Sequence, residues 1–361
     1  MKILLLSAYD AESHRYWWQG LKSHLHEHEW TVLTLPARYF SWRIRSNSLT
    51  WAYTQTDLLN QNYDLILATS MTDLSALKGF VPSLAKTPSI VYFHENQFGY
   101  PGSGKEFKSV EPKILNFYTA LAADMVLFNS EYNSQTFFTG LEKLLKKVPD
   151  LVPPGVVGVL RNRTKVLPVP INQSQNHSDR SEGRFNIVWN HRWEYDKNPK
   201  LLLDSMQRLR EVTDEFTLHV VGRKFRTVPD EFDLIKENLA ENIGHWGYLE
   251  NKSAYQNLLD KADVVLSTAI HDFQGVAVLE AVAAGAVPVV PDRLAYKELF
   301  EEKYRYSEGD GEAKGIANKL LQLMELKKTS GLNSPDISHL SWERLIPEYE
   351  KLFQSVASPS K

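Results

Sequence analysis

Short apolar runs alternate with longer amphipathic segments through the first half of the chain. The segments between the runs place apolar residues at helical spacing. Continuous apolar runs that alternate with helices are typical of parallel strands covered on both faces. We therefore expect a doubly wound α/β domain in this half. Its expected strands are residues 3–6, 31–35, 65–68, 90–93 and 125–128, and its expected helices are residues 13–28, 51–59, 73–77, 111–123 and 131–147.

The periodicity breaks between residues 149 and 183, where prolines, a glycine and a polar run predict an interdomain linker. The alternation then restarts, so we expect a second doubly wound domain and a cleft beyond the carboxyl ends of its strands. Its expected strands are residues 186–189, 217–221, 263–268 and 286–290, and its expected helices are residues 199–212 and 276–284. The expected division is a first domain at 1–170, a linker at 171–183, a second domain at 184–341, and a C-terminal helix at 342–361 that packs back towards the first domain.

Composition excludes several classes of protein. Hydrophobic residues make up 43% of the 361 residues and aromatic residues 11%, as in a globular protein of two domains. The net charge of −3 argues against a general nucleic-acid binder, although a local basic face stays open. The absence of cysteine excludes disulfides and cysteine-ligated zinc. The apolar run at residues 3–6 is too short for a signal peptide or a membrane span, so we expect a cytoplasmic protein without stable membrane association.

The stretch from His271 to Glu280 holds the first candidate site. It lies between two apolar runs, and Gly275 stands where a tight turn would lead into a helix that ends at Gly285. Such a helix start leaves free backbone N–H groups beside a residue without a Cβ, which suits a phosphate. Asp272 and Glu280 would repel a phosphate, so we expect them to accept hydrogen bonds from hydroxyls. A phosphate together with several hydroxyls describes a sugar nucleotide.

Other nucleotide-binding motifs do not match. Residues 7–13, after the first expected strand, contain no glycine, and the lone Gly222 is followed by Arg223 and Lys224. Neither segment is the glycine-rich turn of dinucleotide-binding proteins, and the sequence has no Walker-type loop. A nicotinamide-dependent oxidoreductase is therefore disfavoured.

Two cations and a histidine directly follow expected strands. Arg192 and Lys197 stand five residues apart after residues 186–189, where they could neutralise a diphosphate leaving group. Isolated cations are more often solvated surface residues, but the position of these two at a strand end favours the functional interpretation. His94 follows the expected strand 90–93, and its polar neighbours favour a role in the same cleft over a structural one.

These residues resemble the motifs of a known enzyme family. Asp272 and Glu280, with Arg192 and Lys197, have the spacings found in retaining GT-B glycosyltransferases of the GT4 group. Four segments together resemble the glycosyltransferase-like domain-containing proteins, a group whose members are tRNA-queuosine mannosyltransferases. The resemblance runs from residue 1 to about residue 306. The four segments are YFHENQFGYP (92–101), WNHRWEYDKNP (189–199), STAIHDFQGVAVLEA (267–281) and PDRLAYKE (291–298).

The resemblance implies a GT-B fold of two Rossmann-like domains and a retaining transfer of mannose from GDP-mannose to the queuosine nucleoside of tRNA. It implies no metal and no cofactor besides the nucleotide-sugar donor. The implied roles are diphosphate binding by Arg192, Lys197 and the N–H groups of Gly275 and Val276, ribose binding by Glu280, catalytic contacts to the sugar by Asp272 and His94, and a nucleobase border at residues 244–248 that includes Gly247 and Tyr248.

Two departures from the family pattern affect these expectations. Asp272 stands where the family has Glu, whose side chain is one methylene longer, so the contacts of this carboxylate to the sugar cannot be copied from the family. Ser13 and His14 occupy the region where many GT4 members carry a Gly-Gly turn, so acceptor contacts there cannot be copied from them.

A segment rich in arginine and aromatic residues lies in the expected acceptor domain. Residues 36–45 interleave three arginines with three aromatics, which predicts either an RNA-facing loop or an aromatic-packed loop with solvated arginines. The resemblance favours tRNA. The candidate acceptor residues are Ser13, His14, Arg38, Trp42, Arg43, Arg45 and Asn96.

The expected mechanism depends on charge placement. Cations and helix N–H groups would stabilise the leaving diphosphate, and the acceptor hydroxyl would attack on the same face and lose its proton to a phosphate oxygen. Three other functions stay open: a glycosyltransferase with a lipid-linked, polysaccharide or small-molecule acceptor, a sugar-nucleotide epimerase, and a non-catalytic tRNA-binding module.

Overall fold

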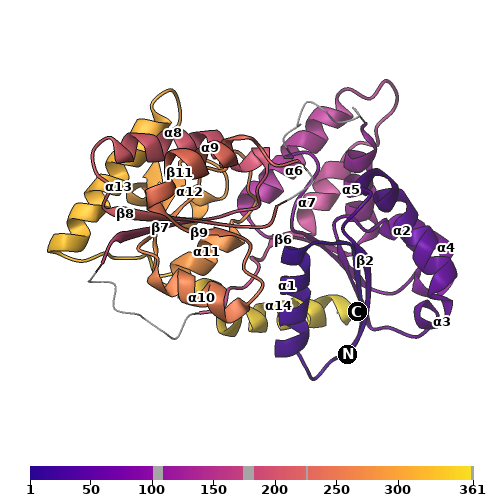
Figure 1. The fold of residues 1–361 in the computed structure, drawn as a ribbon. Helices are drawn as coiled ribbons and strands as arrows, with labels where there is room; N and C mark the ends of the chain where they lie inside the picture. Colours follow the sequence, from indigo (N-terminus) through magenta and orange to yellow (C-terminus); the bar gives the residue numbers. More distant parts are fainter. Residues whose placement is uncertain (101–108, 174–182, 225–226, 359–361) are drawn as a thin grey trace. The chain divides into compact units, whose positions relative to one another are not determined.

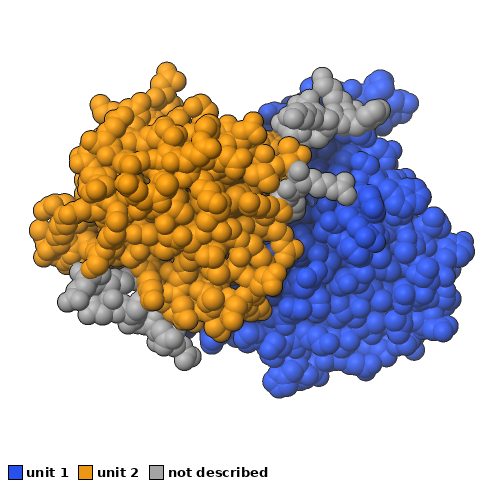
Figure 2. All heavy atoms as spheres, in the orientation of Figure 1, with its two compact units in different colours: residues 1–170, 342–361 blue, residues 171–341 orange. Residues whose placement is uncertain are grey.

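The computed structural model describes residues 1–100, 109–173, 183–224 and 227–358. The chain folds into two compact units, residues 1–170 with 342–361 and residues 171–341, which Figure 2 colours separately. Most of the predicted linker, residues 174–182, and Pro101 at the end of the motif 92–101 lie outside the described residues.

Unit 1 is built on a parallel sheet with strand order β2-β1-β3-β4-β5-β6 (Figure 1). Its strands are β1 (Lys2–Asp10), β2 (Glu29–Pro36), β3 (Leu65–Thr69), β4 (Ser89–Phe93), β5 (Met125–Phe128) and β6 (Thr164–Val166). Its helices are α1 (Glu12–His24), α2 (Phe40–Thr54), α3 (Thr56–Leu59), α4 (Leu74–Phe80), α5 (Glu111–Ala122), α6 (Glu131–Leu145), α7 (Val156–Asn162) and α14 (Trp342–Ala357).

The continuous apolar runs form the central strands of this sheet, as the pattern predicts. Every residue of β3 and of β4 is buried, because helices cover both faces of the sheet. Parallel pairing places the carboxyl ends of all six strands at one edge. His14 and His94, which follow β1 and β4 in the chain, are therefore brought to the same edge.

Two expectations for unit 1 are wrong. Residues 40–45 were expected in a loop but form the first turns of α2, which begins after Tyr39 in the left-handed conformation with φ of 54°. The segment 149–183 was expected to be a linker, yet it contains α7 and β6. Gly155 precedes α7 at φ of 80°, and β6 is an edge strand of three residues that pairs with β5. Strands this short carry too little pattern to detect.

The C-terminal helix α14 packs on unit 1. A Cβ added at Gly20 of α1 would lie 2.0 Å from Cζ2 of Trp342, so the glycine makes room for the indole. The hydroxyl of Tyr349 accepts a hydrogen bond from Trp17 Nε1 at 3.1 Å and donates to the carbonyl of Pro168 at 2.9 Å. These contacts bury the apolar face of α14 and join the end of the chain to its first helix.

Unit 2 is built on a second parallel sheet, with strand order β12-β11-β10-β7-β8-β9 (Figure 1). Its strands are β7 (Phe185–Asn190), β8 (Phe216–Val221), β9 (Ile243–Gly247), β10 (Val264–Leu266), β11 (Val287–Pro291) and β12 (Arg305–Tyr306). Its longer helices are α8 (Pro199–Arg210), α9 (Glu231–Asn238), α10 (Lys252–Lys261), α11 (Val276–Ala283), α12 (Tyr296–Leu299) and α13 (Glu312–Thr329). The predicted strand–turn–helix–strand unit is β10, α11 and β11.

The two parallel α/β sheets confirm the predicted fold class. Within the described part of the chain, no helix is long and apolar enough to cross a membrane.

Candidate active site

The turn before α11 requires glycine. Gly275 has φ of 74°, in the left-handed region that favours a residue without a Cβ. A Cβ at this position would also lie 2.8 Å from Cε1 of Tyr296, closer than packed atoms approach. The first intrahelical bond of α11 joins the Leu279 N–H to the Gly275 carbonyl at 2.9 Å. The N–H groups of the first turn therefore have no acceptor within the helix, and they point out of its start.

Asp272 accepts a hydrogen bond from one of these N–H groups. Its Oδ1 accepts the Gly275 N–H at 2.9 Å, and its Oδ2 lies 3.5 Å from Lys197 Nζ and 3.3 Å from the Tyr296 hydroxyl. The Gly275 N–H, which we expected to bind the diphosphate, is thus bonded to Asp272 instead. The N–H groups of Val276, Ala277 and Val278 are the other groups of this turn without an acceptor within the helix.

The charge on Asp272 is stabilised by its surroundings. Burial alone would raise the pKa of its carboxyl group, but the charge of Lys197 and the hydrogen bond from Gly275 outweigh burial and lower the pKa to about 2. Asp272 is therefore an anion at neutral pH, suited to accept hydrogen bonds from sugar hydroxyls and not to donate a proton.

Lys197 is enclosed by oxygen atoms. Its Nζ donates to the His271 carbonyl at 2.5 Å and lies 3.4 Å from Asp196 Oδ2, in addition to its contact with Asp272. Only 8% of its side chain is exposed. Lys197 ends η2 (Tyr195–Lys197), a short helical turn that places it under the 271–275 loop. Lys197 therefore holds this loop in place and neutralises part of the charge of Asp196 and Asp272.

Arg192 is the more accessible cation. Its guanidinium pairs with Glu194 at 2.7 Å and approaches Asp196 at 3.8 Å, while 47% of its side chain is exposed. Burial raises the pKa of Glu194 although Arg192 opposes the shift. Asp196 thus links the two predicted donor-binding cations, because Arg192 and Lys197 both contact it.

Two buried histidines line the same region in their neutral form. His191 Nε2 lies 3.0 Å from the Ser267 hydroxyl, and the ring of His271 packs edge-on against Phe273. Burial, with a further contribution from Lys197, lowers the pKa of His191 to about 3 and that of His271 to about 4. Both rings are therefore hydrogen-bonding groups at neutral pH and do not add positive charge.

Glu280 is oriented by a tyrosine that the sequence did not single out. The Tyr255 hydroxyl of α10 donates to Glu280 Oε2 at 3.1 Å. Asn190, at the end of β7, donates to the Tyr255 hydroxyl at 3.1 Å and to the Ala277 carbonyl at 2.6 Å. Glu280 is thus a half-buried carboxylate on the second turn of α11, held beside the start of that helix.

The predicted nucleobase border lies at the end of β9. Gly247 has φ of 110°, and its carbonyl accepts the Gly222 N–H at 3.2 Å. The ring of Tyr248 is 40% exposed and lies under the guanidinium of Arg223, 4.7 Å from the ring centroid to Cζ. A Cβ at Gly222 would lie 1.8 Å from the His191 carbonyl oxygen, so this glycine lets two strand-end loops approach each other.

In unit 1, His94 lies in a cluster of rings. Its imidazole stacks on that of His14 with centroids 4.2 Å apart, and it meets Trp17 edge-on at 4.9 Å. Burial and the neighbouring His14 hold the pKa of His94 well below its usual range. Its Nε2 is buried and finds no hydrogen-bond partner among the described residues. His94 is therefore a neutral, preorganised hydrogen-bonding group at the carboxyl edge of the sheet.

His14 and Asn96 have structural partners. His14 is buried, and its Nε2 lies 3.0 Å from Glu95 Oε2. Asn96 is fully buried, donates to Asn133 and Thr136 on α6, and accepts the N–H groups of residues 98 and 99. The side chain of Asn96 thus shapes its own loop, and its contact with the acceptor stays a prediction. His14 therefore contacts both His94 and Glu95.

The other candidate acceptor residues lie on α1, on α2 and just before α2. Ser13 is exposed in the first turn of α1, and Arg38 and Trp42 are exposed before and within the first turn of α2. Arg43 is half-buried, whereas Arg45 is exposed and pairs with Asp73 and Glu111, each at 3.3 Å.

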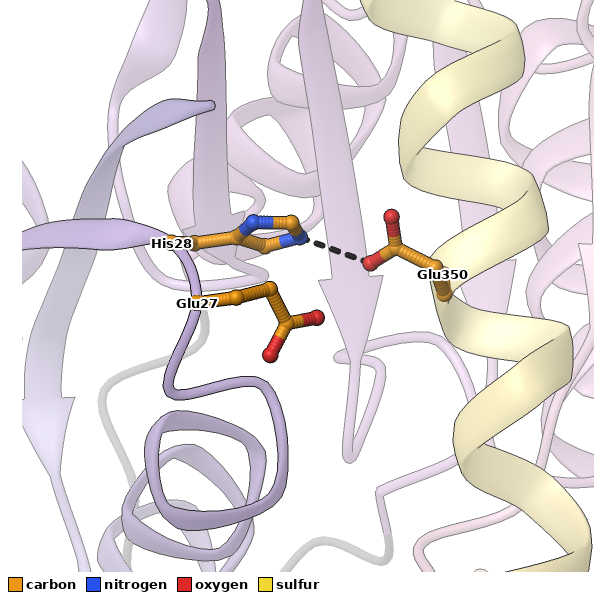
Figure 3. Close-up of side chains that lie close together, drawn as sticks. All are labelled: Glu27, His28 and Glu350. Atoms are coloured by element: carbon orange, nitrogen blue, oxygen red, sulfur yellow. Dashed lines mark hydrogen bonds and ion pairs between the residues drawn. The ribbon is translucent and has the colours of Figure 1, made fainter.

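One group of side chains in the described part of the chain is close enough to hold a metal ion. The donor atoms of Glu27, His28 and Glu350 lie within 4.8 Å of one another (Figure 3). His28 Nε2 is already paired with Glu350 Oε2 at 2.6 Å, and Glu27 is exposed. Because the pair joins the turn after α1 to α14, we assign it to the packing of that helix.

Sequence reasoning missed three residues of the candidate donor site, which are Tyr255, Asp196 and Tyr296. Tyr296 and Asp196 stand within the recognised motifs 291–298 and 189–199, so the motifs contained the signal. Tyr255 stands outside the four motifs, and only the fold brings it to Glu280.

Comparisons with known proteins agree with the fold and the motifs. Residues 2–171 match the family model for the N-terminal domain of tRNA-queuosine alpha-mannosyltransferase, and residues 171–331 match that of glycosyl transferases group 1. The tRNA-queuosine alpha-mannosyltransferase of Drosophila melanogaster is 30% identical over 97% of this chain and 96% of its own length.

Among solved structures, Anabaena Alr3699/HepE in complex with UDP has a TM-score of 0.66 at 16% identity, with 98% of this chain and 99% of that chain covered. Sucrose-phosphate synthase from Thermosynechococcus elongatus has a TM-score of 0.72 at 13% identity, with 99% of both chains covered. These likenesses show the GT-B fold. The motifs, the family model and the full-length relative together show that this chain is a glycosyltransferase of the tRNA-queuosine alpha-mannosyltransferase family.

Proposed function

We propose that the protein transfers mannose from GDP-mannose to the queuosine nucleoside of tRNA with retention of the anomeric configuration. The observation that carries this proposal is the turn at Gly275, where a helix start, a charged Asp272 and the cation pair of Arg192 and Lys197 meet in one unit. Membership of the family supports the acceptor. Because tRNA is an intracellular polymer, we place the reaction in the cytoplasm.

The donor diphosphate would bind at the start of α11. The N–H groups of Val276 and Ala277 can donate to phosphate oxygens, and the exposed guanidinium of Arg192 can pair with the same group. Breaking the sugar–phosphate bond places negative charge on the diphosphate. Donors that are already oriented lower the barrier because they need no reorganisation at that moment, and one such donor is typically worth about 3 kcal/mol.

The sugar and ribose would be held by carboxylates. Asp272, kept anionic by Lys197, is placed to accept hydrogen bonds from sugar hydroxyls, and Glu280, oriented by Tyr255, is placed to accept them from the ribose. His94 of unit 1, neutral and with a buried ring nitrogen that lacks a partner in the described structure, would hydrogen-bond the transferred sugar. The acceptor hydroxyl would pass its proton to a phosphate oxygen on the departing face.

A label-transfer experiment tests this proposal. Labelled GDP-mannose and a labelled UDP-hexose are each incubated with the protein and with tRNA that contains or lacks queuosine. We expect label only on queuosine tRNA and only from GDP-mannose. Arg192→Ala should reduce transfer by about 100-fold or more, whereas Arg208→Ala, an exposed arginine on α8, should not. Transfer from the UDP-sugar, or to tRNA without queuosine, would contradict the proposed donor or acceptor.

A further inference from the structure

Helix α2 exposes a row of large apolar side chains. Trp42, Leu49 and Tyr53 are 65%, 46% and 77% exposed. They stand seven and four residues apart, so they lie on one face of the helix. Tyr39, also 65% exposed, precedes the first turn. We call the four residues Tyr39, Trp42, Leu49 and Tyr53 the α2 surface. Large apolar side chains exposed together on one helix face are candidates for an interaction site.

Positive charge accompanies the α2 surface. Residues 36–56 contain three arginines and no aspartate or glutamate, although the whole chain has a net charge of −3. The guanidinium of Arg38 lies over the ring of Tyr39, 5.5 Å from its centroid. Arg45 is tied to carboxylates of neighbouring elements and so fixes the helix. A partner with negative charge and flat apolar groups complements this surface.

The α2 surface begins at the edge of the sheet where His94 lies. β2 ends at Pro36, at the carboxyl edge shared by the parallel strands, and the ring of Phe40 packs edge-on against Tyr9 near the end of β1. The row from Trp42 to Tyr53 then extends about 16 Å away from that edge along the helix. This arrangement suits a polymer that continues well beyond its reacting nucleoside.

We infer that the α2 surface binds the RNA chain of the acceptor, with bases stacked on Trp42 and Tyr53 and phosphates beside Arg38. The inference rests on the proposed tRNA acceptor and assigns to it a docking surface outside the reacting site. Aromatic rings and arginine are the side chains that bind single-stranded or looped RNA. Ser41 and Thr54 are also exposed on α2, so its exposed side is not the continuous apolar face of a membrane-surface helix.

Binding of a fluorescent, unmodified tRNA transcript to the full chain tests the inference. Trp42→Ser and Tyr53→Ser should each weaken binding about tenfold, because a base–aromatic stack is lost. Leu326→Ser, at an apolar residue of α13 that is 45% exposed, is the control and should bind as the wild type does. Because the substituted side chains are exposed, the variants should keep the wild-type thermal unfolding profile.

Salt dependence separates the two kinds of contact. Arg38→Ala should reduce the slope of log affinity against log salt by about 0.7 to 0.9, the value for one lost phosphate contact, whereas Trp42→Ser should leave the slope unchanged. Wild-type affinity in both aromatic variants would overturn the inference. Loss of binding to anionic phosphatidylserine vesicles, with tRNA binding intact, would also overturn it and favour a membrane.

These experiments distinguish a failure of the α2 surface from a failure of the proposed function. If the variants lose tRNA binding but the wild type transfers no mannose, the surface is supported and the proposed reaction is wrong. If the wild type transfers mannose to queuosine tRNA and the Michaelis constants of both aromatic variants for tRNA are unchanged, the reaction is supported and the α2 surface is not its docking site.

Discussion

Substitution of Lys197 should show how much stability the candidate donor site gains from pairing this lysine with two carboxylates. In Lys197→Met, the buried Asp196 and the half-buried Asp272 lose the cation that both contact. The lowering of the Asp272 pKa from its ordinary 3.8 to about 2 corresponds to about 2 to 3 kcal/mol of stabilisation. Breaking a buried ion pair by removing one partner typically costs about 3 to 5 kcal/mol. We therefore expect the free energy of unfolding of unit 2 to fall by about 3 kcal/mol at neutral pH.

The pH dependence follows from the direction of the shift. A carboxyl group whose pKa is lowered on folding contributes stability that is complete above its unfolded pKa and is lost as the pH falls through its folded pKa. In the wild type the contribution of Asp272 should therefore disappear between about pH 4 and about pH 2. In Lys197→Met, burial of the Asp272 carboxyl group is no longer opposed by the charge of Lys197, so protonation of Asp272 costs the variant less stability than it costs the wild type. The difference between the two proteins should shrink in the same interval.

Urea unfolding followed by fluorescence, with hydrogen exchange of unit 2 peptides, measures this difference. Lys200→Met is the matched control, because Lys200 pairs with Asp204 at the surface of α8 and such pairs contribute about 1 kcal/mol or less. The double variant Lys197→Met with Asp272→Asn should recover part of the loss. An equal loss for Lys197→Met at neutral pH and at about pH 3 would refute the reasoning and point to packing instead of charge.

Three other variants test separate parts of the structure. Gly275→Ala should abolish most transfer and cost at least about 1 to 2 kcal/mol of stability, because its φ of 74° disfavours a Cβ; Gly315→Ala, with open space around it, should not. The stability of the wild type should fall from about pH 7 to about pH 5, because the buried neutral His94 resists protonation. His94→Phe should remove this fall. A difference in urea midpoint between the two proteins that stays constant over this pH range would contradict the prediction. Gly20→Ala should displace Trp342 and destabilise by about 1 to 3 kcal/mol, seen as faster hydrogen exchange in α14; unchanged exchange would be the contrary result.

The sequence predicted the parts of the fold that depend on short-range pattern. The strands 65–68 and 90–93 were found within one residue, because each is a continuous apolar run that is buried on both faces. The turn at Gly275 was found because strand, glycine and helix follow one another directly in the chain. By contrast, α7 and β6 escaped notice, since a helix of seven residues and an edge strand of three carry almost no periodicity.

The contacts within the candidate site were much less predictable. Asp272 was expected to serve the sugar alone, but one of its oxygens closes the Gly275 turn. The link between His14 and Glu95 spans 81 positions in the chain, and Lys197 meets Asp272 across 75. Contacts at such separations are set by the packing of whole elements, and local spacing does not encode them.

The central claim is tested most directly by nucleoside analysis of tRNA after reaction. Queuosine-containing tRNA is incubated with GDP-mannose and the purified protein, digested to nucleosides and examined by mass spectrometry. The account predicts that queuosine is replaced by a nucleoside heavier by one hexose, that an α-mannosidase restores queuosine, and that Arg192→Ala leaves queuosine intact. Unchanged queuosine in the presence of active, folded wild-type protein, or a hexose on another nucleoside, would contradict it.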